Sequence, residues 1–213
     1  GRRSGHGCLI IGCHIVTPVG NTRLRTLTFV FGRFQPPTKG HHRLLVAARQ
    51  YAGDGELRVY PSRTHDHKKN PLTPEQKHHF LRLSFPSMAS CFVDDERVKT
   101  ALDVMTLASE EGFKKVVMVV GGDRLKTFHD LTDKYNGDLY DIEEIQVVSG
   151  GERDPESDGV DGVSATQLRE AAVAGDLRLF RLGLPDDLSH EVSKNLFHAV
   201  AGGLVDHHSS CDT

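Results

Sequence analysis

Residues 31–42, "FGRFQPPTKGHH", bring together groups that can bind and activate a phosphate. The adjacent prolines disfavour a helix in the residue before each of them, so a helix can begin only near Thr38. Its first turn then carries Lys39, Gly40 and His41. Lys39 and His41 can add positive charge, and Gly40 leaves space for an anion beside the free N–H groups of the helix N-terminus. These residues predict a phosphate-binding turn, although an ordinary capped helix with a solvated histidine pair fits them too.

A second helix start with similar chemistry lies at residues 163–169, "VSATQLR". Ser164 and Gln167 have the spacing of a capping box, in which each side chain binds the main-chain N–H of the other. Thr166 and Arg169 follow in the first turns, and an arginine can hold two phosphate oxygens at once. Alone, this pattern is common in capped helices. Two such helix starts in one chain favour a shared phosphate site.

The elements that must position these turns alternate along the chain between apolar strands and amphipathic helices. The predicted strands are 27–31, 56–60, 90–93, 115–120 and 142–149. The predicted helices are 40–51, 73–84, 98–111, 123–131, 164–174, 176–182 and 187–200. This alternation predicts an α/β fold, a Rossmann-like doubly wound parallel sheet of about five strands with helices on both faces. Ligands of such sheets bind beyond the carboxyl ends of the strands, where both helix starts should meet.

Composition and charge limit the classes of partner. A length of 213 residues predicts one domain with a sizeable core. The net charge of −3 argues against a general binder of nucleic acid or of anionic membranes. No segment is apolar enough to span a membrane. The four scattered cysteines form no disulfide framework, which indicates a reduced, cytoplasmic setting. Cys8, Cys13, His14 and His6 match no zinc spacing, so we predict no metal site.

Four stretches resemble signatures of the nucleotidylyltransferase superfamily. "GRFQPPTKGHH" resembles its T/H-x-G-H motif, and "VSATQLR" resembles I-S-S/A-T-x-x-R. "NPLTPEQK" at 70–77 is similar to the N-P-F-T-x-x-E-R stretch of archaeal-type nicotinamide mononucleotide adenylyltransferases, and "VVGGDR" at 119–124 resembles the nucleotide-side loop of the superfamily. The order of the motifs most resembles that of cytidylyltransferase-like proteins encoded by large tailed phages. The resemblance implies a nucleotidylyltransferase domain at 25–203, between tails at 1–24 and 204–213.

The sequence departs from these signatures in three places. Thr38 stands where many members have the first histidine of the motif. Phosphopantetheine adenylyltransferases also carry a threonine at this position. Lys77 replaces the arginine of the N-P-F-T-x-x-E-R stretch, which weakens the nicotinamide assignment. The acidic loop at 150–162 is not standard and could shape the choice of acceptor.

The resemblance implies an in-line attack by an acceptor phosphate on the α-phosphorus of ATP or CTP, with release of pyrophosphate. His41 would donate to the α-phosphate, Thr38 would bind phosphate oxygens, and Arg169 would hold the leaving pyrophosphate. Mg²⁺ would accompany the triphosphate, because it keeps several waters and binds phosphate oxygens. The implied nucleotide- or phosphate-binding residues are Phe31, Gly32, Arg33, Phe34, Lys39, Gly40, Asp123, Ser164 and Thr166.

The acceptor is a phosphorylated small molecule whose identity the sequence leaves open. The basic loop after the second strand, with Arg63, His65 and Asn70, is predicted to contact its phosphate, although a solvated loop fits the same residues. Asp123 likewise fits either a ribose-binding carboxylate or a helix cap. Nicotinamide mononucleotide, a sugar or polyol phosphate, and phosphopantetheine are all candidate acceptors. Homo-oligomerisation also stays open.

Two other functions compete with the enzyme. A nucleotide-binding or assembly protein could keep the fold without turnover, but the intact His41 and Arg169 favour catalysis. A fragment of a class I tRNA synthetase would share the H-x-G-H loop. That alternative fits poorly, since the chain is short, lacks a K-M-S-K-S stretch and is not basic.

Overall fold

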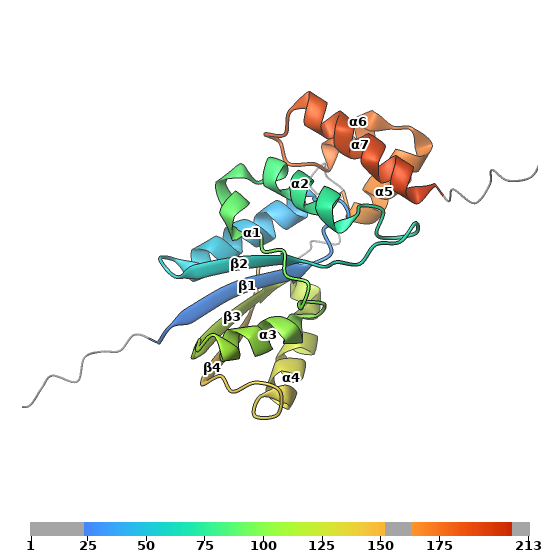
Figure 1. The fold of residues 1–213 in the computed structure, drawn as a ribbon. Helices are drawn as coiled ribbons and strands as arrows, with labels where there is room; N and C mark the ends of the chain where they lie inside the picture. The colour runs from blue at the N-terminus through green and yellow to red at the C-terminus, as the bar shows by residue number, and fades with distance from the viewer. Residues whose placement is uncertain (1–23, 152–162, 206–213) are drawn as a thin grey trace, which may run out of the picture.

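A four-stranded parallel sheet lies at the centre of the computed structural model, which describes residues 24–151 and 163–205 (Figure 1). The strands are β1 (Thr26–Gly32), β2 (Glu56–Pro61), β3 (Lys115–Val120) and β4 (Glu144–Ser149). They lie in the order β2-β1-β3-β4, and every neighbouring pair is parallel. The strand order therefore reverses between β1 and β3, which is the switch point where ligands of such sheets bind.

Helices cover both faces of the sheet, as predicted for a doubly wound fold (Figure 1). One face carries α1 (Lys39–Ala52), α2 (Pro74–Ser84) and the 3₁₀ helix η1 (Pro86–Cys91). The other carries α3 (Ala101–Glu110) and, after the short 3₁₀ helix η2 (Gly122–Arg124), α4 (Leu125–Tyr135). The remaining helices are α5 (Ala165–Ala174), α6 (Leu177–Leu182) and α7 (His190–Leu204). These three pack on one another, and α7 also contacts α2.

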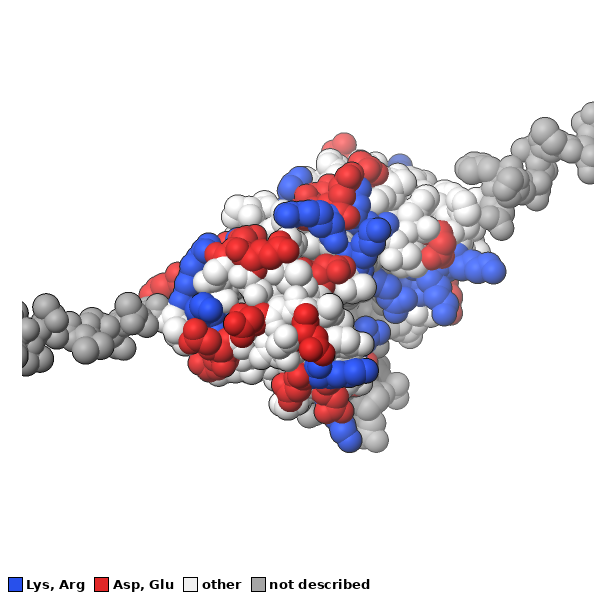
Figure 2. Space-filling view, turned by 60° about the horizontal axis from the view of Figure 1, so that its bottom comes forward, with Lys and Arg blue, Asp and Glu red and all other residues white. Residues whose placement is uncertain are grey.

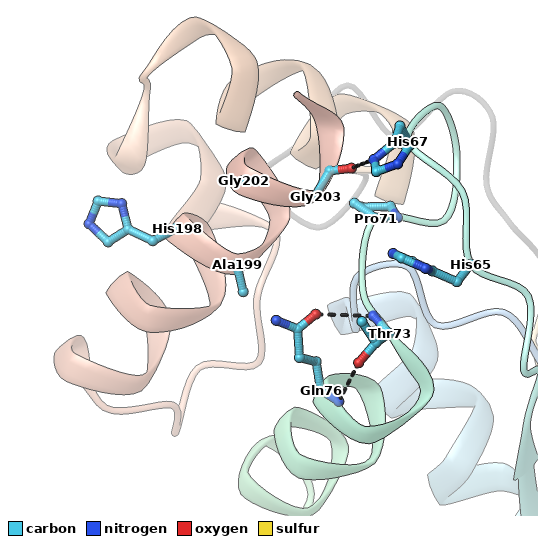
Figure 3. A pocket seen from close by; sticks show the side chains of 9 residues that line it. All are labelled: His65, His67, Pro71, Thr73, Gln76, His198, Ala199, Gly202 and Gly203. Carbon is cyan, nitrogen blue, oxygen red and sulfur yellow. Dashed lines mark hydrogen bonds between the residues drawn. The ribbon is translucent and has the colours of Figure 1, made fainter. Parts of the chain in front are cut away.

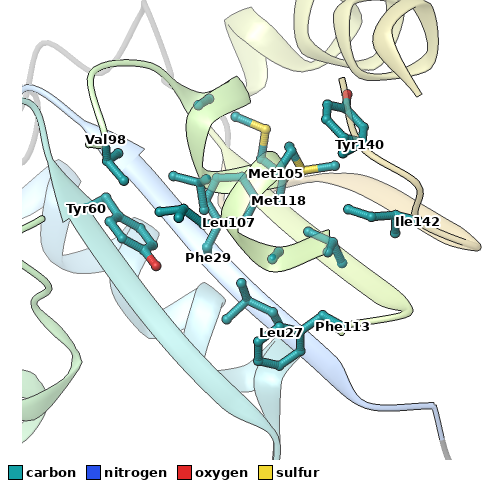
Figure 4. Close-up of a cluster of buried hydrophobic side chains, with 14 of the residues drawn as sticks. Leu27, Phe29, Tyr60, Val98, Met105, Leu107, Phe113, Met118, Tyr140 and Ile142 are labelled. Carbon is teal, nitrogen blue, oxygen red and sulfur yellow. The ribbon is translucent and has the colours of Figure 1, made fainter. Parts of the chain in front are cut away.

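The central strands β1 and β3 are buried on both sides of the sheet, and their successive side chains point alternately to the two faces. Phe29 and Met118 point into the core under α3 and α4, which Figure 4 shows. Val30 and Val119 point into the core under α1 and α2. Burial on both faces explains why the strands are continuous hydrophobic runs rather than alternating patterns.

A third core joins α5, α6 and α7 to the loop between β2 and α2. Leu72 from that loop is fully buried among the side chains of these helices. Gly203 of α7 lies so close to this loop that a Cβ atom at its position would be 2.1 Å from the main-chain oxygen of Pro71. The helical layer is therefore attached to the same loop that was predicted to bind the acceptor.

The sheet has four strands rather than about five, because the segment predicted as a strand at 90–93 is mostly helical. Residues up to Cys91 belong to η1, and Phe92 forms only an isolated parallel bridge to Val59. Met88, Cys91 and Phe92 are buried against α2 and the sheet. Because these side chains pack against α2, the chain pairs with β2 only at the single bridge between Phe92 and Val59.

The predicted helix starts at Thr73 and Ser164 are confirmed as capping boxes. The hydroxyl of Thr73 accepts from the N–H of Gln76, whose side chain accepts from the N–H of Thr73. Ser164 and Gln167 make the same reciprocal pair. Other boundaries differ from the prediction by a few residues, as element ends commonly do.

Several predicted features fall mostly outside the described residues. These are the tails at 1–24 and 204–213 and the acidic loop at 150–162. Across the helices of the described ranges, none has the length and apolar character needed to cross a membrane.

Candidate active site

The first turn of α1 holds the predicted catalytic histidine in a defined orientation. The hydroxyl of Thr38 caps the helix by accepting from the main-chain N–H of His41 at 3.3 Å. In return, Nδ1 of His41 accepts from the main-chain N–H of Thr38 at 3.1 Å and lies 2.9 Å from the Thr38 hydroxyl. Because Nδ1 is an acceptor, the proton of the neutral ring is on Nε2. His41 therefore presents a donor on the side away from its own helix cap.

The loop before α1 packs an aromatic ring against this histidine. Phe34 has a positive φ of 49°, is fully buried, and lies with its ring centroid 4.7 Å from that of His41. Gly32 leaves room for this ring, since a Cβ atom there would be 3.0 Å from the Phe34 ring, closer than ordinary van der Waals contact. Phe34 was predicted to line the nucleotide side, and this stays a prediction; in the structure its ring is fully buried and packs on His41. Phe31 is half-buried against the core under α3 and α4.

Arg169 extends from α5 to the loop that precedes α1. Its Nη1 donates to the main-chain oxygen of Gln35 at 2.7 Å, and its Nη2 donates to the hydroxyl of Thr166 at 3.0 Å. Burial lowers the pKa of Arg169, and the nearby positive charge of Arg33 lowers it further. The site thus holds two like charges near each other, next to the start of α5 that Ser164 caps.

Lys39 binds the turn between α6 and α7 through both its main chain and its side chain. Its main-chain N–H donates to the oxygen of Gly183 at 3.0 Å, and its Nζ lies 2.6 Å from Oδ1 of Asp186. The predicted phosphate-binding lysine is therefore paired with a carboxylate in this structure. Gly40 beside it is exposed, and a Cβ atom at its position would meet only the Thr38 hydroxyl within 4 Å. The surface at Gly40 is thus open to a ligand.

Asp123 lies at the end of β3, the strand next to β1. It is exposed in η2, and its Oδ1 is 2.9 Å from where a Cβ atom on Gly121 would be. The following helix, α4, begins at Leu125 without a side-chain cap, so the alternative of Asp123 as a helix cap is wrong. Its carboxylate stays a candidate for the nucleotide side.

Two residues of the loop predicted to contact the acceptor are engaged in interactions of their own. Arg63 forms a close ion pair with Asp94 and lies 3.5 Å from Glu96. Asn70 is buried and donates from its side chain to Asp66. An acceptor phosphate at Arg63 would have to compete with the two carboxylates.

Asp66 organises this loop. Its Oδ1 accepts from the main-chain N–H groups of Lys69, Lys68 and Asn70. The bond from the Lys69 N–H, together with that from the Asn70 side chain, holds the pKa of the Asp66 carboxyl below its usual range. The main chain of the loop is therefore held in a defined turn, while its side chains at 64, 65 and 67–69 are exposed, so the alternative of a solvated loop stays open.

A cavity of about 370 Å³ lies between this loop and α7 (Figure 3). His65 and His67 line it from the loop, and His198 lines it from α7. Nδ1 of His67 is 2.9 Å from the main-chain oxygen of Gly203, an interaction that connects the two walls. Of the residues predicted for the acceptor, His65 is the one that faces this cavity.

Charged side chains of both signs are interspersed over the face of the molecule in Figure 2. This face presents no extended surface of one sign, in keeping with the small net charge. An extended basic stripe is the usual footprint of nucleic-acid binding. At the candidate site, the positive charge of Arg33 acts on Arg169 and lowers its pKa.

Sequence reasoning missed two residues that shape the site. Gln35 binds both Leu72 and Arg169, and Asp186 pairs with Lys39. Neither has a sequence signal of its own, because each acts through a contact with a distant segment. The prolines after Gln35 indicated a fixed loop, but they did not indicate what fixes it.

The fold and the site together define an α/β protein whose candidate site combines two capped helix starts, a histidine and an arginine that bridges them. Residues 29–171 match the family model described as cytidylyltransferase-like, and the chain belongs to this family. Membership supports a nucleotidyltransferase activity on a nucleotide substrate. A search of curated proteins found no match to the sequence.

Solved structures with the same fold include nicotinic acid mononucleotide adenylyltransferase of Plasmodium falciparum. Its complex with NaAD has a TM-score of 0.54 and 12% identity, with 81% of this chain and 94% of that chain covered. Its complex with APC has a TM-score of 0.53 and 11% identity, with the same coverage of both chains. At this identity the likeness establishes the fold.

Proposed function

We propose that the protein is a nucleotidylyltransferase that moves AMP or CMP from ATP or CTP onto a phosphorylated small molecule. An oxygen of the acceptor phosphate forms a bond to the α-phosphorus of the triphosphate. The bond between the α-phosphorus and the oxygen bridging to the β-phosphate breaks in line, and its electron pair leaves with pyrophosphate. No covalent intermediate on the protein is needed, so catalysis depends on positioning and charge stabilisation.

The observation that carries the proposal is that Arg169 reaches from the first turns of α5 to the main-chain oxygen of Gln35, in the loop that leads into α1. The charge of Arg33 lowers the pKa of Arg169, and a polyanion between them would relieve that repulsion. The first turns of α1 and α5 add main-chain N–H groups and the positive ends of their helix dipoles. A triphosphate carries the charge that suits such a site.

Five of the predicted residues then have a role. The Nε2 proton of His41 donates to a non-bridging oxygen of the α-phosphate as negative charge builds in the transition state. Thr38 orients His41 through the two contacts at Nδ1 and caps the helix. Arg169 and Thr166 hold the β- and γ-phosphates that leave as pyrophosphate. Lys39 contributes indirectly, by tying α1 to the turn after α6.

Mg²⁺ enters in this proposal as part of the triphosphate substrate. Across residues 24–151 and 163–205, no group of three His, Cys, Asp or Glu side chains could hold a metal ion. Mg²⁺ typically keeps several waters and binds through phosphate oxygens, so it needs no protein cage here. The bound ion would neutralise charge on the phosphates, while the protein supplies the donors around them.

The acceptor is proposed to approach from the loop between β2 and α2. His65 lines the cavity beside α7, and Arg63 and Asn70 lie in the same loop. The NaAD bound to the Plasmodium enzyme of the same fold makes nicotinic acid mononucleotide a candidate acceptor worth including. Nicotinamide mononucleotide, sugar and polyol phosphates, and phosphopantetheine complete the set.

The test is release of pyrophosphate from each of the four ribonucleoside triphosphates, with Mg²⁺, in the presence of each acceptor. We expect turnover with ATP or CTP and one acceptor class, and strong loss of turnover in Arg169→Ala. Exchange of labelled pyrophosphate into the triphosphate is measured with each acceptor present, because direct in-line transfer gives exchange only with the acceptor bound, and a protein that only binds nucleotides gives none. Binding of ATP or CTP with neither turnover nor exchange for any acceptor would favour the alternative of a nucleotide-binding protein.

A further inference from the structure

Gln35 lies buried between the two loops that frame the candidate site. Only 2% of its surface is exposed. Its Nε2 donates to the main-chain oxygen of Leu72 at 2.9 Å, and its Oε1 accepts from the N–H of Leu72 at 3.0 Å. This reciprocal pair fastens the loop before α1 to the loop between β2 and α2.

The main-chain oxygen of the same residue holds Arg169. Nη1 of Arg169 donates to it at 2.7 Å, within the range of a charge-assisted hydrogen bond. One residue thus connects three segments that are far apart in the sequence: the β1–α1 loop, the β2–α2 loop and α5. The side chain of Gln35 binds one loop while its carbonyl binds the guanidinium.

The position of that carbonyl depends on the side-chain pair. The amide of Gln35 makes two bonds to the main chain of Leu72, and its Nε2 also donates to the main-chain oxygen of Thr64 at 3.4 Å. All three bonds hold the side chain against the loop between β2 and α2. Without these bonds, the main-chain N–H and oxygen of Leu72 would lose their partner in a buried environment, which is costly. The loops would then shift relative to each other, and the carbonyl that orients Arg169 would shift with them.

We propose that Gln35 is a positioning residue that couples the acceptor loop to Arg169. It sets where the guanidinium lies relative to His41, and it sets where the β2–α2 loop lies relative to both. The inference rests on the proposed nucleotidylyltransferase function, since it assigns Arg169 to the leaving pyrophosphate and this loop to the acceptor. Gln35 itself touches neither substrate.

The chain offers a matched control for the side-chain pair. Asn136, after α4, makes the same reciprocal bonds to one residue: its Nδ2 donates to the oxygen of Ile142 at 3.0 Å, and its Oδ1 accepts from the N–H of Ile142 at 3.1 Å. This loop leads into the amino end of β4, whereas the site lies beyond the carboxyl ends of the strands. Gln35→Met and Asn136→Leu therefore remove the same kind of reciprocal pair at opposite ends of the strands, although Asn136 is exposed whereas Gln35 is buried.

The experiment compares kcat and KM of the two variants with those of the wild type, together with their unfolding midpoints in urea. We expect Gln35→Met to lose more stability than Asn136→Leu, because water can reach the exposed position of Asn136 and replace the lost bonds there. Only Gln35→Met should lose kcat, by about 10²-fold, because small misplacements of a catalytic group cost that much. Its KM for the acceptor should also rise, whereas the KM values of Asn136→Leu should stay at the wild-type level.

A double-mutant cycle tests whether Gln35 acts through Arg169. In an Arg169→Lys background, Gln35→Met should lower kcat much less than it does in the wild type, because residues of one network are not additive. Fully additive losses would overturn the coupling. Wild-type kcat and KM in Gln35→Met would overturn the inference altogether, and so would equal kinetic losses in Gln35→Met and Asn136→Leu.

Two further measurements keep the outcomes separate. If Gln35→Met does not fold, Gln35→Leu provides the kinetics, since it also removes both bonds to Leu72 and, like methionine, introduces no buried charge. If the wild type turns over no triphosphate, the proposed function is wrong, and the inference is then judged on binding of Mg-ATP and Mg-CTP by calorimetry. Weaker binding in Gln35→Met than in Asn136→Leu would support it, and equal binding would overturn it.

Discussion

The main-chain N–H of Thr38 donates to Nδ1 of His41 at 3.1 Å, so the cap of α1 also selects the tautomer of the candidate catalytic group. The Phe34 ring packs on the same imidazole. Helix start, ring orientation and proton position are thus set by one local arrangement. A change at position 41 can therefore separate the capping function from the donor function.

His41→Asn is the change that makes this separation. The oxygen of the asparagine side chain lies near the place of Nδ1 and can still accept from the Thr38 N–H, but nothing replaces the Nε2 donor. We expect turnover to fall by about 10²–10³-fold, the usual effect of losing one donor to the transition state. Steady-state kinetics and thermal unfolding measure the two effects, and the melting temperature should stay near that of the wild type.

Thr38→Val provides the complementary variant. It removes the hydroxyl that caps α1, so it should cost about 1 kcal/mol of stability. If His41→Asn turned over at the wild-type rate, the donor assignment would be wrong. If it unfolded at a much lower temperature, His41 would be mainly a structural residue.

The two arginines predict that a polyanion stabilises the folded protein. Arg33 lowers the pKa of Arg169, and pyrophosphate between them would remove that repulsion. At a concentration of about 100 times its Kd, a ligand that binds only the folded state adds about 2.7 kcal/mol to the free energy of unfolding. We expect the melting temperature to rise with pyrophosphate, and Arg169→Met to lose most of that rise. An equal rise in both proteins would place the anion elsewhere.

Lys39 is expected to matter less for catalysis than its place in the motif suggests. Its Nζ is paired with Asp186, a partner that is mostly exposed, and such surface pairs contribute about 0–1 kcal/mol. Lys39→Met should therefore leave the KM for the triphosphate within about threefold of the wild type, since little free energy is at stake. A much larger rise in KM would mean that Lys39 leaves Asp186 to bind phosphate.

The local features of the fold were predictable from sequence because their causes are local. The capping boxes at Thr73 and Ser164 depend on residues three positions apart, and both are present. The apolar run at 115–120 predicted β3 with its bounds, since a strand buried on both faces is hydrophobic throughout. The parallel sheet followed from the alternation of such strands with helices.

The features that sequence did not reveal depend on contacts between distant segments. Phe34 lies within the motif, yet its ring is buried because Gly32 leaves room for it and His41 packs against it. Arg63 was predicted to face the acceptor, but Asp94 lies close enough to pair with it. No spacing along the chain indicates either arrangement.

The glycine pair at the end of α7 offers a direct test of how the helical layer is attached. A Cβ atom on Gly203 would be 2.1 Å from the main-chain oxygen of Pro71, whereas one on Gly202 would meet nothing within 4 Å. Gly203→Ala should therefore destabilise the protein by about 1–3 kcal/mol, as overpacking does. Gly202→Ala should be neutral or stabilising by up to about 1 kcal/mol, because alanine favours helix. Equal effects in urea unfolding would show that α7 can shift away from Pro71.

Lys77 is expected to make stability depend on pH in the alkaline range. Its side chain is fully buried and its Nζ donates to the main-chain oxygen of Ser62. Burial, with a smaller contribution from the charge of Arg63, lowers its pKa from 10.5 to about 8. Below pH 8 the folded protein carries the cost of a buried charge, and above it the folded protein releases the proton while the unfolded chain still binds it.

The sign follows from this difference in bound protons. Between about pH 8 and 10.5 the unfolded chain binds more protons than the folded protein, so the free energy of unfolding should rise with pH. The full gain is on the order of 3 kcal/mol, from about 1.4 kcal/mol for each unit of pKa. Urea unfolding of the wild type and of Lys77→Met at pH 7.5, 9 and 10 (values chosen on either side of about 8) isolates it. The free energy of unfolding of the wild type should rise relative to that of Lys77→Met as pH rises, because the methionine side chain does not titrate. Curves that stay parallel over this range would show that Lys77 is neutral already at pH 7.5 or keeps its proton beyond pH 10.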